Sequence, residues 1–115
     1  MIRYRVIVPP GLKDRAGHLP PTVKQKVRAS LRLLEIEPMV GKLLERELAG
    51  YWSYPIHPYR VIYQIETSER RVHLVMVELR REVYDLLVQQ IPVVRDRIRR
   101  RGSHRRVAET ASLLR

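Results

Sequence analysis

The sequence has 115 residues, enough for one domain with a short appendage. It has no cysteine, which excludes disulfides and thiolate metal sites, and we expect a cytoplasmic protein. No apolar run approaches the roughly 20 residues of a membrane-spanning helix, and we expect no membrane partner. With 23 Lys and Arg against 12 Asp and Glu, the net charge of +11 favours nucleic acid or an acidic protein as partner.

The positive charge is concentrated toward the C-terminus. Residues 91–115 contain eight arginines and two acidic residues, whereas residues 1–90 contain 15 basic and ten acidic residues. We therefore expect a moderately basic domain over residues 1–90 and a strongly basic extension over residues 91–115. The arginines of the extension either remain solvated or bind RNA phosphates with an affinity that falls as salt rises; the candidates are Arg95, Arg97 and Arg99.

The first part of the sequence predicts one strand and two helices. Residues 3–8 have the alternating pattern of a strand, and a short helix is expected over residues 12–18. Thr22 and Gln25 have the spacing of a capping box, so a long helix should begin at Thr22 and end before Pro38. Its apolar face is formed by Val23, Val27, Leu31 and Leu34.

The second part predicts a run of strands and a C-terminal helix. A helix over residues 82–90 should be interrupted by Pro92, with a second, basic helix over residues 93–101. The fold class is therefore α+β: two N-terminal helices packed on one face of a small, mostly antiparallel sheet, then a C-terminal helix and the basic extension. The strands are expected, with the short links of a meander, over residues 42–48, 51–56, 59–66 and 71–79.

Cationic and aromatic side chains gather at the predicted strand ends. Arg60 lies on the less apolar side of its strand, Arg80 and Arg81 lie at the end of the last strand, and Tyr84 follows one helical turn later. A guanidinium binds phosphate oxygens through two donors, and a tyrosine ring stacks on an unpaired base. These residues can bind single-stranded RNA and stabilise charge on a phosphate.

The same residues also have a purely structural interpretation. Arg60 could form an ion pair with Glu47 or Glu78 across the sheet, because ion-pair networks are common in folded domains. Tyr84 could pack its helix on the sheet. The sequence leaves both interpretations open.

Further candidates for RNA binding lie in the two preceding strands. Trp52 and Tyr54 share one face of their strand and belong either to the core or to an RNA site, since a single tryptophan is more often buried. Lys42 and Arg46 add positive charge to the strand before. None of the four histidines has the spacing of a metal site, so we expect no metal and no cofactor.

Six short motifs, in order over roughly residues 2–90, resemble the RelE/ParE superfamily of bacterial toxins. The resemblance implies a RelE-like toxin domain over residues 1–90 and a type II toxin–antitoxin system. The motifs are Lys13-Asp14, Leu19-Pro20, Pro38-x-x-Gly41-Lys42-x-Leu44, Glu47-Leu48-x-Gly50-x-Trp52, Tyr59-Arg60-Val61-Ile62-Tyr63 and Arg80-Arg81-Glu82-Val83-Tyr84.

The resemblance also implies an activity. RelE-type toxins are ribosome-dependent endoribonucleases that cut mRNA by metal-independent attack of a 2′-hydroxyl on the adjacent phosphate. A cognate antitoxin holds them inactive. The implied partners are therefore the ribosome, mRNA and an acidic or amphipathic antitoxin segment laid over the basic groove and the helix at residues 82–90.

By resemblance, Arg60 corresponds to the arginine that stabilises the phosphate, and Tyr84 to the tyrosine that stacks on the target base. Either Arg80 or Arg81 corresponds to the arginine tied to protonation of the leaving group. The alignment does not choose between these two neighbours.

One departure from the family concerns the proton acceptor. RelE proper has lysines in the strand before Arg60, and one of them accepts the proton, whereas the strand of this chain has none. His57, as a neutral imidazole, or Glu47 could take that role. The departure leaves two alternatives to the ribonuclease: a ParE-like gyrase inhibitor, or a catalytically degenerate module that binds RNA or the antitoxin.

Overall fold

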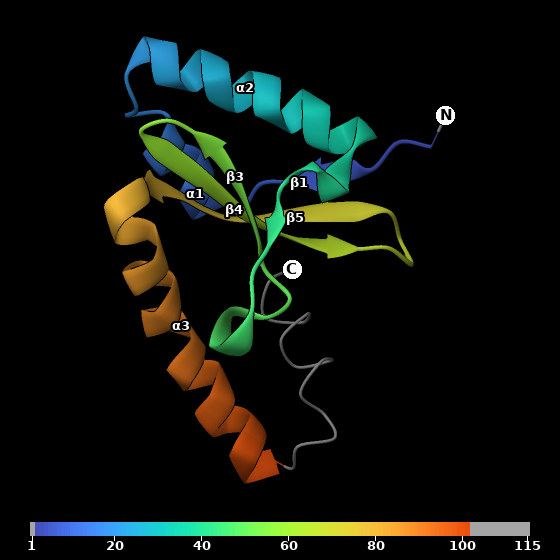
Figure 1. Cartoon of the computed structure of the whole chain (residues 1–115), viewed down its shortest axis with the longest axis vertical. Coiled ribbons are helices and arrows are strands. Elements are labelled where there is room, and N and C mark those ends of the chain that lie inside the picture. The colour runs from blue at the N-terminus through green and yellow to red at the C-terminus, as the bar shows by residue number, and fades with distance from the viewer. Residues whose placement is uncertain (1, 102–115) are drawn as a thin grey trace.

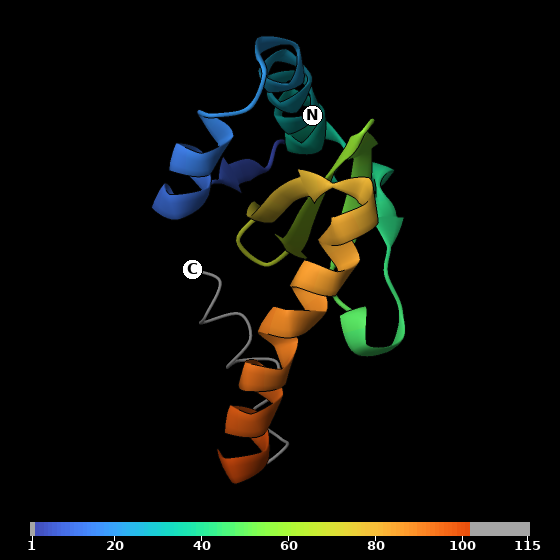
Figure 2. The same cartoon turned by 90° about the vertical axis from the view of Figure 1, so that its left-hand side faces the viewer.

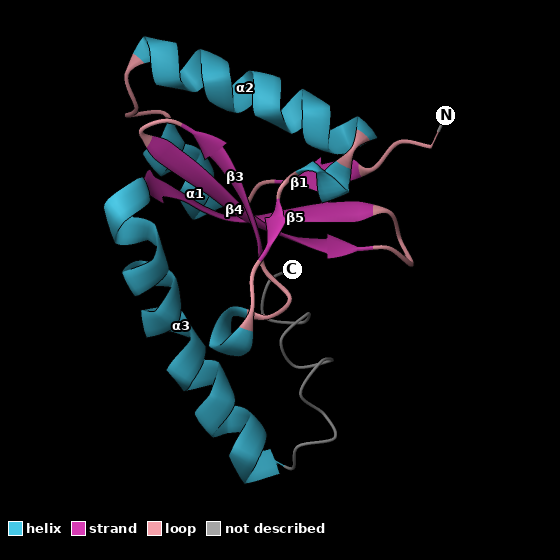
Figure 3. Ribbon diagram, viewed as in Figure 1, coloured by secondary structure: helices cyan, strands magenta, loops and turns pink. Residues whose placement is uncertain are grey.

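The computed structural model describes the backbone of residues 2–101 and the side chains of residues 2–90. It is an α+β fold, as the sequence predicts (Figures 1 and 3). The elements in chain order are β1 (Arg5–Ile7), α1 (Pro10–Ala16), α2 (Pro21–Ile36), the 3-10 helix η1 (Pro38–Val40), β2 (Lys42–Leu43), the 3-10 helix η2 (Arg46–Leu48), β3 (Trp52–Ile56), β4 (Tyr59–Glu66), β5 (Arg71–Leu79) and α3 (Arg80–Arg101).

The strands form one mixed sheet in the order β1-β5-β4-β3-β2. Strands β2 to β5 pair antiparallel, and β1 pairs parallel with β5. Helices α1 and α2 cover one face of the sheet, and α3 lies across the other (Figures 1 and 2). The predicted arrangement of two N-terminal helices on one face is confirmed.

Both faces of the central strand β4 are buried. Val61 and Tyr63 point toward α1 and α2, Ile62 points toward α3, and all three side chains have 0% exposure. Because neighbouring residues of a strand point to opposite faces, the fold has two core layers that share this strand. The face away from α2 is covered by α3 where its buried side chains, Val83 and Leu87, pack on the sheet.

The predicted capping box is wrong. Helix α2 begins at Pro21, with Pro20 as the residue before it, and no side chain caps its first turn. A proline at the first helical position has its backbone torsion preset and no N–H to satisfy, so the turn begins without a cap. The end of the helix before Pro38 agrees with the prediction.

Two other predicted boundaries are wrong. The strand expected over residues 42–48 is reduced to β2, because Arg46 adopts a left-handed backbone with φ of 57° and opens η2 instead. The break expected at Pro92 does not occur, since α3 continues through it and joins the two predicted helices. A proline in a helix removes one backbone hydrogen bond, and this helix accommodates the loss.

Two hydrogen bonds of the Tyr63 hydroxyl hold the segment between α2 and β2 against the sheet. Its hydroxyl donates to the carbonyl of Pro38 at 2.7 Å and accepts from the amide of Gly41 at 3.2 Å. A Cβ at Gly41 would lie 2.5 Å from that hydroxyl and 2.8 Å from the carbonyl oxygen of Ser53. The position therefore requires glycine because of the close approach, and the approach fixes where β2 begins.

We predict that Gly41→Ala lowers the free energy of unfolding by about 1–3 kcal/mol, the usual cost of forcing atoms into a filled space. Urea denaturation measures the change. The matched control is Gly11→Ala in α1, where a Cβ meets nothing within 4 Å. This control should gain about 0.5–1 kcal/mol from helix propensity. Equal stability of wild type and Gly41→Ala would contradict the packing described for Tyr63.

Candidate functional site

The hydroxyl of Ser53 joins two of the predicted site residues. Nη1 of Arg60 donates to Ser53 Oγ at 3.2 Å, and the hydroxyl of Tyr84 donates to the same oxygen at 3.3 Å. Ser53 itself has 0% exposure, whereas Arg60 and Tyr84 are partly buried. We call Ser53, Arg60 and Tyr84 together the Ser53 site. The sequence did not single out Ser53, because a small hydroxyl in a strand has no pattern of its own.

Strand register places Ser53 and Arg60 on one face. In the β3–β4 pair, Pro55 lies opposite Arg60 and Ser53 lies opposite Ile62. Side chains directly opposite in an antiparallel pair share a face, and so do residues two apart. The face is the one that α3 covers, since Ile62 belongs to the core layer under that helix.

The start of α3 brings Tyr84 to the same place. The helix begins directly after β5, and the amide of Arg80 donates to the carbonyl of Pro58 at 2.8 Å, which ties the helix start to the β3–β4 turn. Val83 and Leu87 are fully buried and hold the first turns against the sheet. Tyr84, next to Val83, then reaches Ser53.

Arg60 has a carboxylate opposite it on the next strand but forms no ion pair with it. Among the described side chains no ion pair involves Arg60, although Glu78 lies directly opposite it in the β4–β5 register. Its Nε is buried and has no hydrogen-bond partner among the described residues. The predicted structural interpretation, in which Arg60 pairs with a carboxylate across the sheet, is therefore wrong for this structure. The guanidinium keeps donors for an anion.

Arg80 and Arg81 are exposed on the first turn of α3. They precede Tyr84 by four and three residues, so both lie within one helical turn of it. His57, also exposed, is in the β3–β4 turn that the amide of Arg80 contacts through Pro58. These three residues therefore lie at the same end of the sheet as Arg60.

Glu47 occupies a different place. It is on η2, which packs beside α3 (Figures 1 and 2), and its side chain is exposed. Arg46, on the same turn, is exposed as well. Both residues lie in the segment between β2 and β3, away from the β3–β4 turn.

The predicted RNA-binding residues divide between the two faces. Lys42 lies opposite Ser53 in the β2–β3 pair, on the side of α3, and is exposed. Trp52 and Tyr54 point to the other face, where both pack against the core under α1 and α2, and the Trp52 ring stacks on Tyr63 with centroids 6.2 Å apart. The structure does not bring these two aromatic residues to the Ser53 site. The side chains of Arg95, Arg97 and Arg99 lie outside the described residues.

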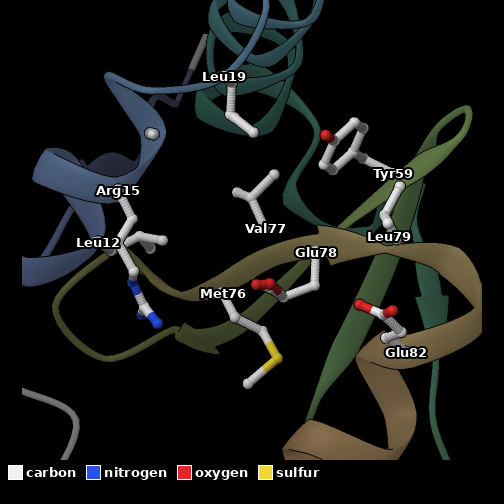
Figure 4. Close-up of a pocket in the computed structure, with 10 residues that line it drawn as sticks. Leu12, Arg15, Leu19, Tyr59, Met76, Val77, Glu78, Leu79 and Glu82 are labelled. Carbon is white, nitrogen blue, oxygen red and sulfur yellow. The ribbon is translucent and has the colours of Figure 1, made fainter.

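A cavity of about 260 Å³ lies near the site but has the opposite charge (Figure 4). Leu12 and Arg15 of α1 form one wall, and Met76, Val77 and the carboxylates of Glu78 and Glu82 form the other. Two carboxylates in a small cavity disfavour a phosphate. An anionic ligand therefore fits the Ser53 side of the sheet better than this cavity.

A larger, more apolar groove of about 530 Å³ lies on the face of the sheet opposite the Ser53 site. It runs between α1, α2 and the sheet, with Leu12, Leu31 and Leu74 among its lining residues. Three cations also contribute to the lining: Lys13, Lys24 and Arg28. Its apolar floor and cationic rim suit an amphipathic protein segment rather than RNA.

The described part of the chain has neither a cluster of metal ligands nor a membrane-spanning helix. No group of three or more His, Asp or Glu side chains there has the arrangement to hold a metal ion. No described helix is long and apolar enough to cross a membrane.

Comparisons with known proteins identify the fold. The model of a protein family, the ParE toxin of the type II toxin–antitoxin system parDE, matches residues 12–84. A chain of the RelBE2 toxin–antitoxin complex from Mycobacterium tuberculosis is 32% identical, covers 69% of this chain and 100% of its own, and has a TM-score of 0.63. Comparison with curated protein sequences gives no match.

Two more distant structures share the fold. A chain of the archaeal RelE–RelB complex from Pyrococcus horikoshii is 21% identical, covers 70% of this chain and 97% of its own, and has a TM-score of 0.60. A mutant of E. coli toxin RelE in the free state is 19% identical, covers 77% and 98%, and has a TM-score of 0.63.

The fold and the Ser53 site define a small α+β protein with a cationic site between its sheet and its last helix. The chain belongs to the RelE/ParE superfamily, the toxins of type II toxin–antitoxin systems. The resemblance drawn from the six sequence motifs is confirmed. The family model carries the name of ParE and the similar structures carry that of RelE, so the comparisons do not separate these two branches.

Tyr63, which holds the chain next to the site, should make the protein sensitive to alkali. Burial raises the pKa of Tyr63 to about 12 from the ordinary value of 10.0, and the hydrogen bond from Gly41 opposes this shift. Because the folded-state pKa is the higher one, the native state favours the neutral phenol. This contribution to stability is complete below pH 10 and is lost as the pH rises toward about 12.

We predict that the free energy of unfolding, followed by urea denaturation, falls between these pH values and falls less in Tyr63→Phe. A smaller fall should remain in the variant, because burial also raises the pKa of Tyr51. An equally steep fall in wild type and variant would contradict this assignment.

Proposed function

We propose that this toxin is a ribosome-dependent endoribonuclease that cuts mRNA without a metal ion. The observation that carries the proposal is the Ser53 site, where Arg60 and Tyr84 converge on one hydroxyl while the guanidinium has no carboxylate partner among the described residues. A fixed cation beside an aromatic ring is suited to a phosphate next to an unpaired base.

The reaction needs three protein contributions. The 2′-oxygen forms a bond to its adjacent phosphorus, the bond from phosphorus to the 5′-oxygen breaks, and the products are a 2′,3′-cyclic phosphate and a 5′-hydroxyl. A base takes the proton of the 2′-hydroxyl, an acid gives one to the 5′-oxygen, and a cation stabilises the negative charge that grows on the phosphate. Arg60 supplies the cation, because its free donors already lie in a partly buried position.

The other roles follow from position. Tyr84 stacks on the target base, with its hydroxyl held by Ser53. Arg80 and Arg81, one helical turn away, contact the phosphate or the leaving oxygen. His57 suits the proton acceptor better than Glu47, since it lies in the turn at the Arg60 end of the sheet and Glu47 lies on η2.

We further propose that an antitoxin is the inhibiting partner. Two of the similar structures are chains of toxin–antitoxin complexes, and the net charge of +11 favours an acidic segment. One part of that segment would cover α3 and the Ser53 site. An amphipathic part would fit the apolar groove with the cationic rim on the opposite face.

The test is to add the protein to translating ribosomes and map the 5′ ends of the mRNA. The proposal predicts new ends in the A-site codon, with a 2′,3′-cyclic phosphate on the upstream fragment. Intact mRNA at protein concentrations that saturate the ribosomes would overturn it and leave the gyrase inhibitor and the degenerate RNA- or antitoxin-binding module.

Removal of the cation should abolish most of the activity. We predict that Arg60→Ala lowers the single-turnover cleavage rate by about 100- to 1,000-fold, the usual loss when one stabilising donor is removed from a transition state. The matched control is Arg32→Ala, which removes the same charge from an exposed position of α2 and should cut at the wild-type rate. Equal rates for Arg60→Ala and Arg32→Ala would exclude Arg60 from the reaction.

Loss of the shared hydroxyl should have a smaller effect. We predict that Ser53→Ala folds normally but cuts about tenfold more slowly, because misplacing the reacting groups costs rate without removing any of them. Circular dichroism checks the fold, and the same cleavage assay gives the rate. A wild-type rate in Ser53→Ala would show that Arg60 and Tyr84 need no common anchor.

Gyrase inhibition is the second candidate, because the matching family model is that of ParE. Supercoiling of plasmid DNA by purified gyrase separates the two candidates. The ribonuclease proposal predicts that the protein cuts mRNA and does not inhibit gyrase. Inhibition of gyrase with intact mRNA would favour the ParE-like function.

A further inference from the structure

We propose that Lys42 is a second cation at the Ser53 site, beside Arg60, and binds the same RNA phosphate as Arg60, from the opposite side of Ser53. We also propose that Tyr63 is the positioning residue that holds Lys42 there. Both inferences rest on the proposed ribonuclease function and extend it to Lys42, on β2, and to Tyr63, on the same strand as Arg60.

Strand register carries the first part. Lys42 lies directly opposite Ser53 in the β2–β3 pair, so the two Cβ atoms share a face and lie about 5 Å apart. The next residue on that face, Leu44, is buried in the core layer under α3, and the amide of Leu44 donates to the carbonyl of Tyr51 at 2.9 Å. The side chain of Lys42 therefore starts on the same side of the sheet as Arg60 and Tyr84.

The three side chains come from three different elements around Ser53, and two of them, Arg60 and Tyr84, donate hydrogen bonds to it. Arg60 comes from β4 on one side of Ser53, Lys42 from β2 on the other, and Tyr84 from α3. Lys42 is exposed and forms no ion pair with a described carboxylate. The four-carbon stem of lysine can carry its ammonium over the neighbouring strand, where an anion at the guanidinium of Arg60 would be within reach.

The chain next to Lys42 is held more firmly than a two-residue edge strand would be alone. The preceding residue is Gly41, whose amide donates to the Tyr63 hydroxyl, and the same hydroxyl donates to Pro38. Tyr63 has 0% exposure, so its ring and hydroxyl are fixed in the core. Water cannot compete for a hydroxyl buried in this way, so the two hydrogen bonds set the position of β2 against β3.

If β2 served only to complete the edge of the sheet, its position would not need the two hydrogen bonds of the Tyr63 hydroxyl. Leu43 points to the other face and is exposed, so the edge strand buries little of its own surface. The residue that its register places at the site is Lys42. The clamp by Tyr63 is therefore better explained by the placement of a cation than by core packing at β2.

The test measures single-turnover cleavage of mRNA on ribosomes by wild type, Lys42→Ala, Lys42→Arg and Arg32→Ala. We expect Lys42→Ala to cut about tenfold more slowly, the usual effect of losing one charge-assisted contact. Lys42→Arg should recover most of the rate, because it restores the charge, and Arg32→Ala should match wild type. A rate for Lys42→Ala equal to that of Arg32→Ala would overturn the role of Lys42 and leave the ribonuclease proposal standing.

Tyr63→Phe separates positioning from general stability. It keeps the ring but loses both hydrogen bonds. We expect Tyr63→Phe to slow cleavage several-fold when Lys42 is present and to have little effect in the Lys42→Ala background, because the two residues act through one contact. Equal slowing in both backgrounds would mean a merely structural role and would overturn this part.

If wild type leaves mRNA intact, the ribonuclease proposal fails, and RNA binding then tests whether Lys42 contacts a phosphate. The probe is a fluorescently labelled single-stranded RNA with a 2′-deoxynucleotide at the target position, titrated at several salt concentrations. A salt slope for Lys42→Ala that is lower by about one unit than that of wild type would keep the phosphate contact. Identical slopes, or no binding by wild type, would overturn it.

Discussion

The site depends on one buried hydroxyl that receives hydrogen bonds from two distant parts of the chain. Ser53 lies on β3, Arg60 reaches it from β4, and Tyr84 reaches it from α3. Neither donor is fixed by its own element alone, since each is a long, partly buried side chain at the rim of a core layer. A common acceptor gives both of them a defined direction, which a cationic site needs before it can stabilise charge in a transition state.

The remainder of the fold serves to keep that acceptor in place. The core layer under α1 and α2 and the layer under α3 both include β4, so the register of β3 against β4 cannot slip without exposing fully buried side chains. Within β4, Arg60 carries a buried Nε with no described partner. An unsatisfied buried donor costs about 1–3 kcal/mol, so its presence at this position is better explained by a ligand than by stability.

Much of this fold follows from the sequence, and the failures have specific causes. The predicted ranges of β4 and β5 agree with the structure because both are long and their apolar runs end at clear turns. The alternating pattern of apolar and polar residues also predicted a strand through residue 48. Such a pattern does not reveal the left-handed backbone of Arg46, where the strand ends. The rule that proline ends a helix worked at Pro38 and failed at Pro92, because the rule contains nothing about what the rest of a helix contributes.

The candidate site was predictable in its residues but not in its assembly. Arg60 and Tyr84 follow from motif and residue chemistry, whereas Ser53 and the placement of Lys42 require the register of β2 and β3. Trp52 and Tyr54 were correctly assigned a common face, but only the packing of α2 reveals that this face is away from Arg60. Sequence patterns give the side of a strand, and tertiary structure decides what that side meets.

We propose that the guanidinium of Arg60 is held ready for an RNA phosphate. Nitrogen-detected NMR of the Arg60 Nε–H group tests it most directly, with an RNA that carries a 2′-deoxynucleotide at the target position and therefore cannot be cut by its own hydroxyl. The account predicts that this resonance shifts and that its hydrogen exchanges more slowly on saturation, because a donor without a partner gains one. An unchanged resonance, with RNA bound elsewhere on the protein, would contradict the account.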